Sequence, residues 1–284
     1  MKRYFSFLLL AFCLCIHSIK AAEPLKREFR GAWIQAVNGQ FIGMTPAQMQ
    51  STLTTQLDAL QRAGINAIIF QVRPEADALY LSYYEPWSRY LTGEQGVAPE
   101  PYWDPLQWMI DQCHSRGMEL HAWINPYRAK TKGTQSLGIK HPYKKDPERF
   151  VHYDGMLIFN PALQDNRDYI CTIVTDIVKR YDVDGLHIDD YFYPTTDTYF
   201  DSGIYVETGV TQTLSDWRLD NVSKMVKGIY DSIKSANENV LFGVSPQGNV
   251  ENNYELMYAD VKKWCSEEGY LDYIVPQIYF GLEN

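Results

Sequence analysis

Short apolar segments alternate with longer amphipathic segments from residue 29 onward. Six of the apolar segments have the length and composition of β-strands, at residues 30–35, 66–73, 119–125, 185–191, 240–245 and 273–279. Helix start and stop signals lie between them, from Thr45 to Gly64 and from Asp104 to Gly117, and a further helix is predicted from Ser215. This alternation predicts a parallel sheet flanked by helices, either closed as a barrel or doubly wound.

The parity of residues along these strands distinguishes the two architectures. In a barrel, every second residue points into the interior, and the last ones line the catalytic mouth. Five strands carry mainly polar or aromatic residues on one parity: Gln71 and Arg73; His121, Trp123 and Asn125; His187, Asp189 and Tyr191; Gly243 and Ser245; Gln277 and Tyr279. No Gly-rich phosphate loop follows the first strand, as a dinucleotide-binding doubly wound fold would have. We therefore expect an α/β protein of the TIM-type (β/α)-barrel class.

Two adjacent carboxylates end the fourth predicted strand. Residues 184–194 read DGLHIDDYFYP, an apolar strand followed by Asp189 and Asp190. Desolvating an unpaired charge costs several kcal/mol, so carboxylates in this context are expected to have a use. By parity, Asp189 faces the mouth beside His187. Asp190 points toward neighbouring loops or helices, and a capping role for it is as good an interpretation as a catalytic one.

A second group of acids follows the second strand. Residues 71–80 read QVRPEADALY, which places Arg73 at the strand end and Glu75 and Asp77 on the exiting loop. Together with Asp189, this group supplies the two carboxyl groups of a glycosidase, a protonated acid and an ionised base or nucleophile. Arg73 is expected to hold one of them ionised. The alternative is that Glu75 and Asp77 are solvated acids on a surface loop.

Aromatic residues crowd an irregular stretch from about residue 79 to residue 103. A long and strongly aromatic loop in a compact domain indicates a functional wall, and Tyr and Trp pack against the apolar faces of sugar rings. We expect Trp87 of this loop and Trp123 of the third strand to be stacking platforms. The third strand continues through Asn125 to Arg128, which adds hydrogen-bond donors. An alternative for His121 and His187 is that they bind a metal ion, although no metal-ligand spacing in the sequence supports it.

The first residues predict a secretory signal peptide. Lys2 and Arg3 precede an apolar run, residues 5–16, that is too short to span a bilayer, and Ala21 and Ala22 are small residues suited to cleavage. We expect residues 1–21 to be removed and residues 22–284 to form one exported domain, in the periplasm, in the cell envelope or outside the cell.

Composition narrows the partners of that domain. Three of the 26 Lys and Arg residues precede residue 21, and the chain has 35 Asp and Glu residues, so the predicted mature chain carries a net charge near −12. Such a charge argues against nucleic acid and anionic lipid as partners. Cys113, Cys171 and Cys265 remain after the signal, and their odd number and spacing predict buried helical thiols rather than disulfides. The oligomeric state is left open.

Motifs at every predicted strand end resemble one family. They are FRGAW at 29–33, QVRPEADALY at 71–80, EPWS at 85–88, HAWINPYR at 121–128, DGLHIDDYFYP at 184–194, DWR at 216–218, GVSP at 243–246 and PQIY at 276–279. In this order they resemble the glycosyl hydrolase-like family 10 of bacterial exported proteins. The resemblance implies a TIM-type barrel that acts on glycans without a cofactor, with peptidoglycan glycan strands among the substrates of relatives.

The fourth-strand pattern is also similar to that of the α-amylase group, and this analogy implies that Asp189 is the nucleophile, with His187 where that group has Arg. The acid that group carries on the fifth strand is missing here, because Ser245 and Gln247 occupy its place. The proton donor is therefore expected to be Asp77 or Glu75.

The family's barrel has eight strands, and this sequence predicts six. We expect an open arc of six parallel strands, incomplete at the C-terminus, with unpaired edges at the first and sixth strands.

The predicted function is hydrolysis of a polysaccharide, with the peptidoglycan glycan chain as one possibility. Two other classes remain open, a glycan-binding protein on a catalytically silent barrel and a metal-dependent hydrolase or deacetylase. The fold alone does not choose among them, because this barrel hosts many chemistries.

Overall fold

The computed structural model of the protein describes residues 28–281, so the predicted signal peptide lies outside the described residues. The chain divides into two units, Met1–Arg30 and Gly31–Asn284, and all the elements discussed below belong to the second. Among the described residues, no helix combines the length and the apolar character that crossing a membrane requires.

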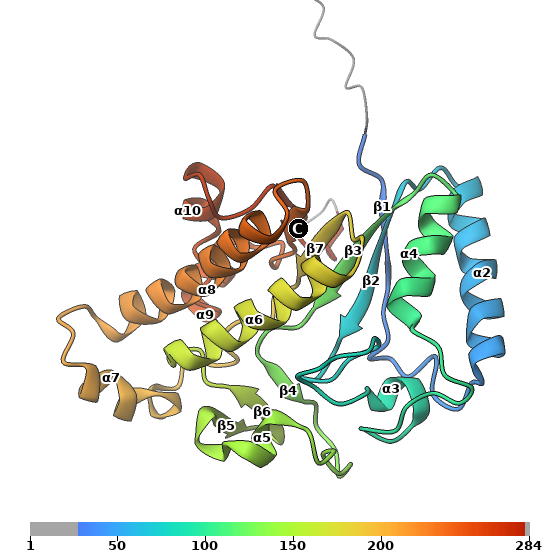
Figure 1. The fold of residues 1–284 in the computed structure, drawn as a ribbon. Coiled ribbons are helices and arrows are strands. Elements are labelled where there is room, and N and C mark those ends of the chain that lie inside the picture. Colours follow the sequence, from blue (N-terminus) through green and yellow to red (C-terminus); the bar gives the residue numbers. More distant parts are fainter. Residues whose placement is uncertain (1–27, 282–284) are drawn as a thin grey trace, which may run out of the picture. The chain divides into compact units, whose positions relative to one another are not determined.

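Six strands form a parallel sheet in the order β1-β2-β3-β7-β8-β9 (Figure 1). They are β1 Gly31–Ile34, β2 Ala67–Arg73, β3 Glu119–Ile124, β7 Gly185–Ile188, β8 Leu241–Val244 and β9 Tyr273–Ile274. All five pairings are parallel. Within the described residues, β1 and β9 each pair on one side only, so the sheet is the expected open arc, a half-barrel. The predicted strands 185–191 and 273–279 end earlier than expected, at Ile188 and Ile274.

Helices join the strands along the chain. They are α2 Pro46–Arg62, α3 Arg89–Thr92, α4 Pro105–Ser115, α5 Pro142–Lys145, α6 Gln164–Arg180, α7 Ser202–Thr208, α8 Leu214–Ala236, α9 Val250–Leu256 and α10 Val261–Ser266. Figure 1 shows α2 beside α4, and α6 beside α8. The predicted helices from Thr45 and Asp104 are confirmed. The helix expected from Ser215 begins one residue earlier, at Leu214, because Thr213 caps it.

Local chemistry sets the helix ends. Thr45 and Gln48 form a reciprocal capping box at the start of α2, and Asp104 caps α4 through the backbone N–H of Gln107. Gly64 and Gly117, which follow these helices, have φ angles of 83° and 68°. Glycine reaches this left-handed region without steric cost, so both helices end where the sequence predicts.

A second, antiparallel sheet was not predicted. Strands β4 Arg128–Lys130, β5 Phe150–Tyr153 and β6 Met156–Phe159 pair in the order β4-β6-β5 between β3 and α6. Asp154 and Gly155, with φ angles of 48° and 75°, form the two-residue turn between β5 and β6. An Asp-Gly pair between two apolar runs is a strong hairpin signal, and it was the sequence feature that would have revealed this sheet.

The cysteine prediction was only partly right. Cys113, Cys171 and Cys265 are free thiols on α4, α6 and α10, as expected, but only Cys113 is buried. Cys171 is half-buried and Cys265 is exposed. The sequence pattern predicts that each thiol lies on a helix. Whether the thiol is buried depends on which face of that helix packs against the rest of the protein.

Candidate active site

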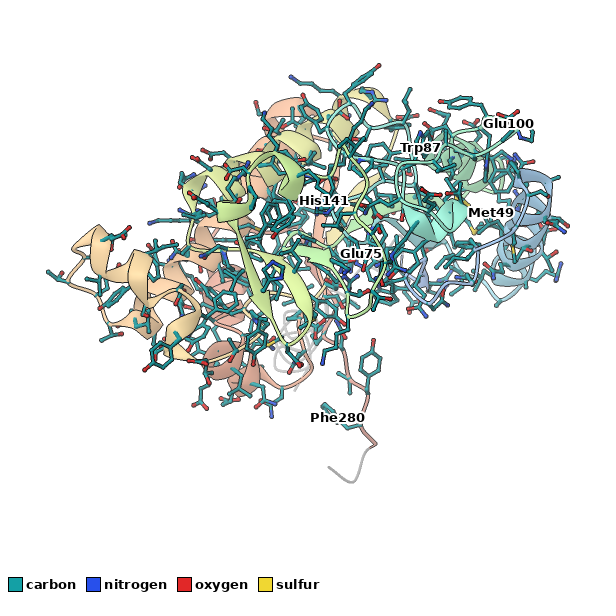
Figure 2. All side chains as sticks on the ribbon, turned by 90° about the horizontal axis from the view of Figure 1, so that it is seen from below. Met49, Glu75, Trp87, Glu100, His141 and Phe280 are labelled. Carbon is teal, nitrogen blue, oxygen red and sulfur yellow. The ribbon has the colours of Figure 1, made fainter. Side chains whose placement is uncertain are left out.

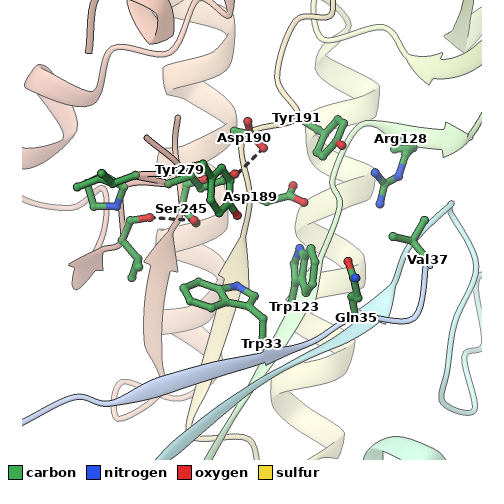
Figure 3. Close-up of a pocket in the computed structure, with 14 residues that line it drawn as sticks. Trp33, Gln35, Val37, Trp123, Arg128, Asp189, Asp190, Tyr191, Ser245 and Tyr279 are labelled. Carbon is green, nitrogen blue, oxygen red and sulfur yellow. Dashed lines mark hydrogen bonds between the residues drawn. The ribbon is translucent and has the colours of Figure 1, made fainter. Parts of the chain in front are cut away.

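A pocket of about 600 Å³ lies at the C-terminal ends of the parallel strands (Figure 3). Its lining residues lie in the last part of a strand or follow one: Trp33 in β1, with Gln35 and Val37 after it; Trp123 and Arg128 around the end of β3; Asp189, Asp190 and Tyr191 after β7; Ser245 after β8; and residues 275–279 after β9. Ligand sites of parallel barrels are built at this end, because the loops there converge on one opening.

Asp189 is the carboxylate at the centre of this pocket. It is 5 % exposed, and its Oδ2 accepts a hydrogen bond from the Asn125 amide, while its Oδ1 has no hydrogen-bond partner. In Figure 3 the carboxyl lies between Tyr191 and Trp123 and extends to the side on which Arg128 lies. Burial, reinforced by the negative charge of Asp190, raises the pKa of Asp189 to about 6, and the positive charge of Arg128 opposes this shift. One oxygen is therefore held by Asn125, and the other is buried without a side-chain hydrogen-bond partner.

The neighbours of Asp189 on the pocket wall orient one another. The Arg128 guanidinium lies 4.6 Å from the Tyr191 ring centre and donates to the Pro74 carbonyl and to Asn125 Oδ1. Across the pocket, Gln277 donates to Asp190 Oδ1 at 3.1 Å and to the Ser245 carbonyl at 2.9 Å.

Seven of the predicted residues thus line one pocket. They are Trp123, Arg128, Asp189, Tyr191, Ser245, Gln277 and Tyr279. Asp190, an eighth predicted residue, also lines the pocket, although parity directed it toward neighbouring loops or helices and left its role open.

Asn125 lies behind this wall instead of on it. It is fully buried, and its side chain contacts Gln71, Arg128 and Asp189. The predicted direct contact of Asn125 with substrate is therefore replaced by contact with a pocket carboxylate.

The two predicted histidines lie deeper than expected. The hydroxyl of Tyr273 is 2.7 Å from His121 Nδ1 and 3.1 Å from His187 Nδ1, and both rings are fully buried. Burial, with a contribution from His121, lowers the pKa of His187 to about 3, so the ring is neutral. The parity of both residues was right, but they occupy an inner layer of side chains that fills the barrel below the pocket.

Arg73 was predicted in the mouth and lies elsewhere. Its Nε and Nη2 donate to the two carboxylate oxygens of Glu85 at 2.7 and 2.6 Å, and both side chains are buried. The cause is a shift of register in β2, where Gln71 pairs with Trp123 but Arg73 pairs with Ile124. One extra residue reverses the parity after it, so Arg73 shares the outward face of Ile124.

Glu75 and Asp77 are also absent from the pocket. Glu75 accepts from Arg89 Nε at 2.7 Å and Nη2 at 3.1 Å, and these bonds, with those from Thr131, outweigh burial and lower its pKa. Burial, together with the charge of Glu75, raises the pKa of Asp77 to about 7, and Asp77 accepts from Gln95 Nε2 at 3.0 Å. Glu75 lies among packed side chains in Figure 2. Neither acid is solvated, and both anchor the loop 79–103 from within.

That loop does not form the expected pocket wall, because none of its residues lines the pocket. Trp87 packs edge-on against Tyr102, with ring centres 6.2 Å apart. The aromatic side chain that the prediction missed is Trp33, which is 42 % exposed at the pocket and meets the His187 ring edge-on at 5.7 Å. Strand parity applied to the first strand would have found Trp33 and Gln35.

Trp33 and Trp87 provide a matched pair for a test. Trp33→Ala should weaken oligosaccharide binding by about 1 kcal/mol, roughly five-fold in Kd, because an aromatic platform is lost. Trp87→Ala should lower the melting temperature and leave Kd unchanged. Calorimetric titration and thermal melts of both variants measure this. Equal effects of the two substitutions on Kd would contradict the assignment of Trp33 to the pocket.

Within residues 28–281, no group of three or more His, Cys, Asp or Glu side chains is arranged to hold a metal ion. His121 and His187 both bond the Tyr273 hydroxyl through their Nδ1 atoms. The pocket's polar atoms are instead carboxylate, guanidinium, amide, hydroxyl and indole groups.

A parallel (β/α) half-barrel with a carboxylate and two indoles at the C-terminal ends of its strands has the architecture of glycoside hydrolase TIM barrels. Solved structures that share this fold with the chain include two glycoside hydrolases. The glycoside hydrolase domain of PgaB (BpsB) from Bordetella bronchiseptica has a TM-score of 0.56 at 12 % identity, covering 87 % of this chain and 73 % of that one. Alpha-L-fucosidase isoenzyme 2 from Paenibacillus thiaminolyticus has a TM-score of 0.55 at 13 % identity, covering 78 % and 34 %.

Sequence comparison then gives the family. Residues 28–283 match the glycosyl hydrolase-like 10 family, and the chain belongs to it. The chain is similar to glycosyl hydrolase YngK of Bacillus subtilis (38 % identical, covering 90 % of this chain and 55 % of the relative). It is also similar to glycosyl hydrolase DigH of Escherichia coli K12 (36 %, covering 81 % and 58 %). The chain thus spans a little over half the length of these curated relatives.

Proposed function

We propose that the protein cleaves glycosidic bonds in a polysaccharide, with Asp189 as the reacting carboxylate. The observation that carries the proposal is the state of its two oxygens, one held by Asn125 and the other unpartnered in a pocket of about 600 Å³. A buried carboxylate oxygen left without a donor is costly, and such groups gather at functional sites. Membership of a glycosyl hydrolase-like family and the shared barrel fold support the proposal.

The pocket suits a sugar ring. Two residues that line the pocket, Trp123 and Asp189, each have a buried atom without a hydrogen-bond partner, the indole Nε1 and the carboxylate Oδ1. Sugar hydroxyls suit both kinds of group, since a hydroxyl accepts from an indole N–H and donates to a carboxylate. Trp33 and Trp123 offer ring faces to the apolar face of the sugar. We infer a glycan substrate on this basis, and peptidoglycan glycan strands, reached by export across the membrane, are the substrate that we propose to test first.

The two pocket carboxyls divide the acid and base roles. With a pKa of about 6, Asp189 is mostly ionised at neutral pH, the state that a nucleophile or base needs. Asp190 is the other carboxyl that lines the pocket, and Gln277 orients it. We propose Asp190 as the proton donor in place of Asp77 and Glu75, because those two side chains are bound to the loop and do not reach the pocket.

The experiment is digestion of purified peptidoglycan glycan strands, with and without stem peptides, followed by mass spectrometry of the products. New reducing ends that appear with the protein and not with Asp189→Asn support the proposal. Binding of the strands without product would favour a catalytically silent glycan-binding barrel. Removal of acetyl groups, lost on chelation and restored by a metal, would favour a metal-dependent deacetylase.

The proton-donor assignment has its own test. Asp190→Asn should lower turnover by about 10²–10⁴-fold, the usual contribution of a positioned acid. Asp77→Asn should leave turnover within a few-fold of the unsubstituted protein. Initial rates at saturating substrate compare the two variants. A large loss with Asp77→Asn, and none with Asp190→Asn in proteins of equal melting temperature, would return the role to Asp77.

A further inference from the structure

We propose that Gln71 is a positioning residue, which sets the orientation of the Asn125 amide and through it presents a hydrogen-bond donor to Asp189. Gln71 is fully buried on β2 and does not line the pocket. The inference rests on the proposed function only in treating Asp189 as the reacting group. The three contacts of the relay are present whether or not the protein is a hydrolase.

The first step fixes the Gln71 amide. Its Oε1 accepts two hydrogen bonds, from the backbone N–H groups of Ala36 and Val37, both at 2.9 Å. A backbone N–H can only donate, so the atom facing both of them must be the carbonyl oxygen. The Gln71 Nε2 group therefore points the other way, toward Asn125, and can only donate.

The second step fixes the Asn125 amide. Its Oδ1 accepts from Gln71 Nε2 at 2.7 Å and from Arg128 Nη2 at 2.6 Å, and neither donor can accept in return. Rotating the amide by 180° would set its NH₂ against two donors. The NH₂ group of Asn125 is thereby held toward Asp189 Oδ2, to which it donates.

The third step is electrostatic. A donor held on Asp189 Oδ2 favours the ionised carboxylate, while Oδ1 has no hydrogen-bond partner. The charged groups that also act on Asp189 are Arg128, which favours ionisation, and Asp190, which opposes it. Gln71 adds no charge of its own. Its effect must therefore pass through the direction of the Asn125 amide, and this makes the effect separable from ordinary packing.

The relay also links Asp189 to the opposite wall of the pocket. Ala36 and Val37 belong to the segment after β1 that carries Gln35 and Val37 into the pocket lining. One side chain thus ties the backbone of this wall to the carboxylate, across β2 and β3. A purely structural glutamine would need only the two backbone contacts, whereas the third contact of Gln71 is to Asn125, the residue that donates to Asp189.

The test titrates the Asp189 carboxyl by NMR in protein labelled with carbon-13 at the aspartate carboxyl carbon, with Asp189→Asn to assign its signal. Gln71→Met removes the donor without adding charge, and Gln71→Glu keeps the size while placing an acceptor against Asn125 Oδ1. Both should raise the measured pKa of Asp189, by roughly half a unit or more, since the donor on Oδ2 is no longer fixed. Gln71→Glu should raise it further, because its negative charge also acts on Asp189 directly, so Gln71→Met is the variant that tests the relay alone. The acidic limb of the pH–turnover profile should move the same way.

Asn166→Leu is the matched control. Asn166 is a fully buried amide that donates to the Arg149 and Asn160 carbonyls, away from Asp189. It should lower the melting temperature and leave the Asp189 titration unchanged. If both Gln71 variants lose stability but the pKa of Asp189 in them equals that in the unsubstituted protein, the inference fails and Gln71 is structural.

A second measurement needs no substitution at Gln71. In the unsubstituted protein, the side-chain amide signals of Gln71 and Asn125 should both titrate with the pKa of Asp189. A Gln71 signal that stays constant while Asp189 ionises would overturn the relay. Neither measurement uses substrate, so absence of glycosidase turnover would contradict the proposed function and leave this inference standing.

Discussion

Replacing Asp189 by Asn should abolish glycosidase turnover and raise the melting temperature at neutral pH. The activity falls because the carboxylate that reacts with substrate is gone, a loss of at least about 10²–10⁴-fold for a reacting acid or base. The stability rises because Asp189 is buried and its pKa is raised to about 6, chiefly by burial. An amide of the same shape keeps the contact with Asn125 without the cost of a buried charge.

The sign of the pH dependence follows from that shift. The folded protein holds the Asp189 proton up to about pH 6, whereas the unfolded chain releases it near the ordinary value of 3.8. Ionised Asp189 therefore destabilises the folded state fully above pH 6, and this cost fades to zero as the pH falls to about 4. The gain of Asp189→Asn should be on the order of 3 kcal/mol at pH 7–8 and should vanish near pH 4.

Denaturant unfolding of both proteins from pH 4 to pH 8 measures this gain. Asp182→Asn is the control, since its side chain is 90 % exposed and its removal should change little at any pH. A variant that is less stable than the unsubstituted protein at pH 8, with residual turnover, would mean that the Asp189 carboxylate serves the fold instead of the chemistry.

Breaking the Arg73–Glu85 pair should have the largest effect on stability. Both side chains are buried, and Arg73 makes two charge-assisted bonds to Glu85 at 2.6 and 2.7 Å. Arg73 also donates to the carbonyls of Asn125 and Pro126, so it holds the chain leaving β3. Arg73→Met leaves the Glu85 charge buried without its partner, which costs about 3–5 kcal/mol. Chemical denaturation at pH 7 measures the free energy of unfolding.

A partly exposed pair gives the comparison. Arg116 bonds Asp58, whose side chain is 45 % exposed, and Arg116→Met should cost about 1 kcal/mol or less. Replacing both buried partners, as in Arg73→Met with Glu85→Leu, should recover much of the loss, because no charge is then stranded. A double variant as unstable as Arg73→Met would contradict the ion-pair explanation and assign the loss to the backbone contacts of Arg73.

The alternation of side chains was sufficient to predict which residues reach the pocket on strands that have no bulge. Trp123, Asp189 and Ser245 lie where the alternation of side chains places them, because parallel strands in register bring the same parity to the same face. The same rule predicted that the sheet is parallel and that its chemistry lies at the C-terminal ends. These features depend on local periodicity, which is present in the sequence itself.

The second strand shows where that reasoning ended. Its register shift after Gln71 turned Arg73 to the outer face, and the two acids that follow were drawn toward Arg89 and Gln95 of a loop 14 and 18 residues farther along the chain. A bulge leaves no periodic signal, because it adds one residue without altering composition. The partner of a buried charge is likewise settled by packing between distant segments.

The sequence by itself determined the half-barrel class, the end of the sheet that carries the pocket and the position of Asp189 in it. Tertiary structure alone decided that Asn125 holds Asp189 Oδ2 and that Gln71 holds Asn125, contacts that join residues 64 and 54 positions apart. It also decided that Trp33, and not Trp87, faces the pocket. Periodicity specifies the face of a strand on which a side chain lies, whereas the depth at which it lies and its hydrogen-bond partner are set by how strands and loops far apart in sequence pack together.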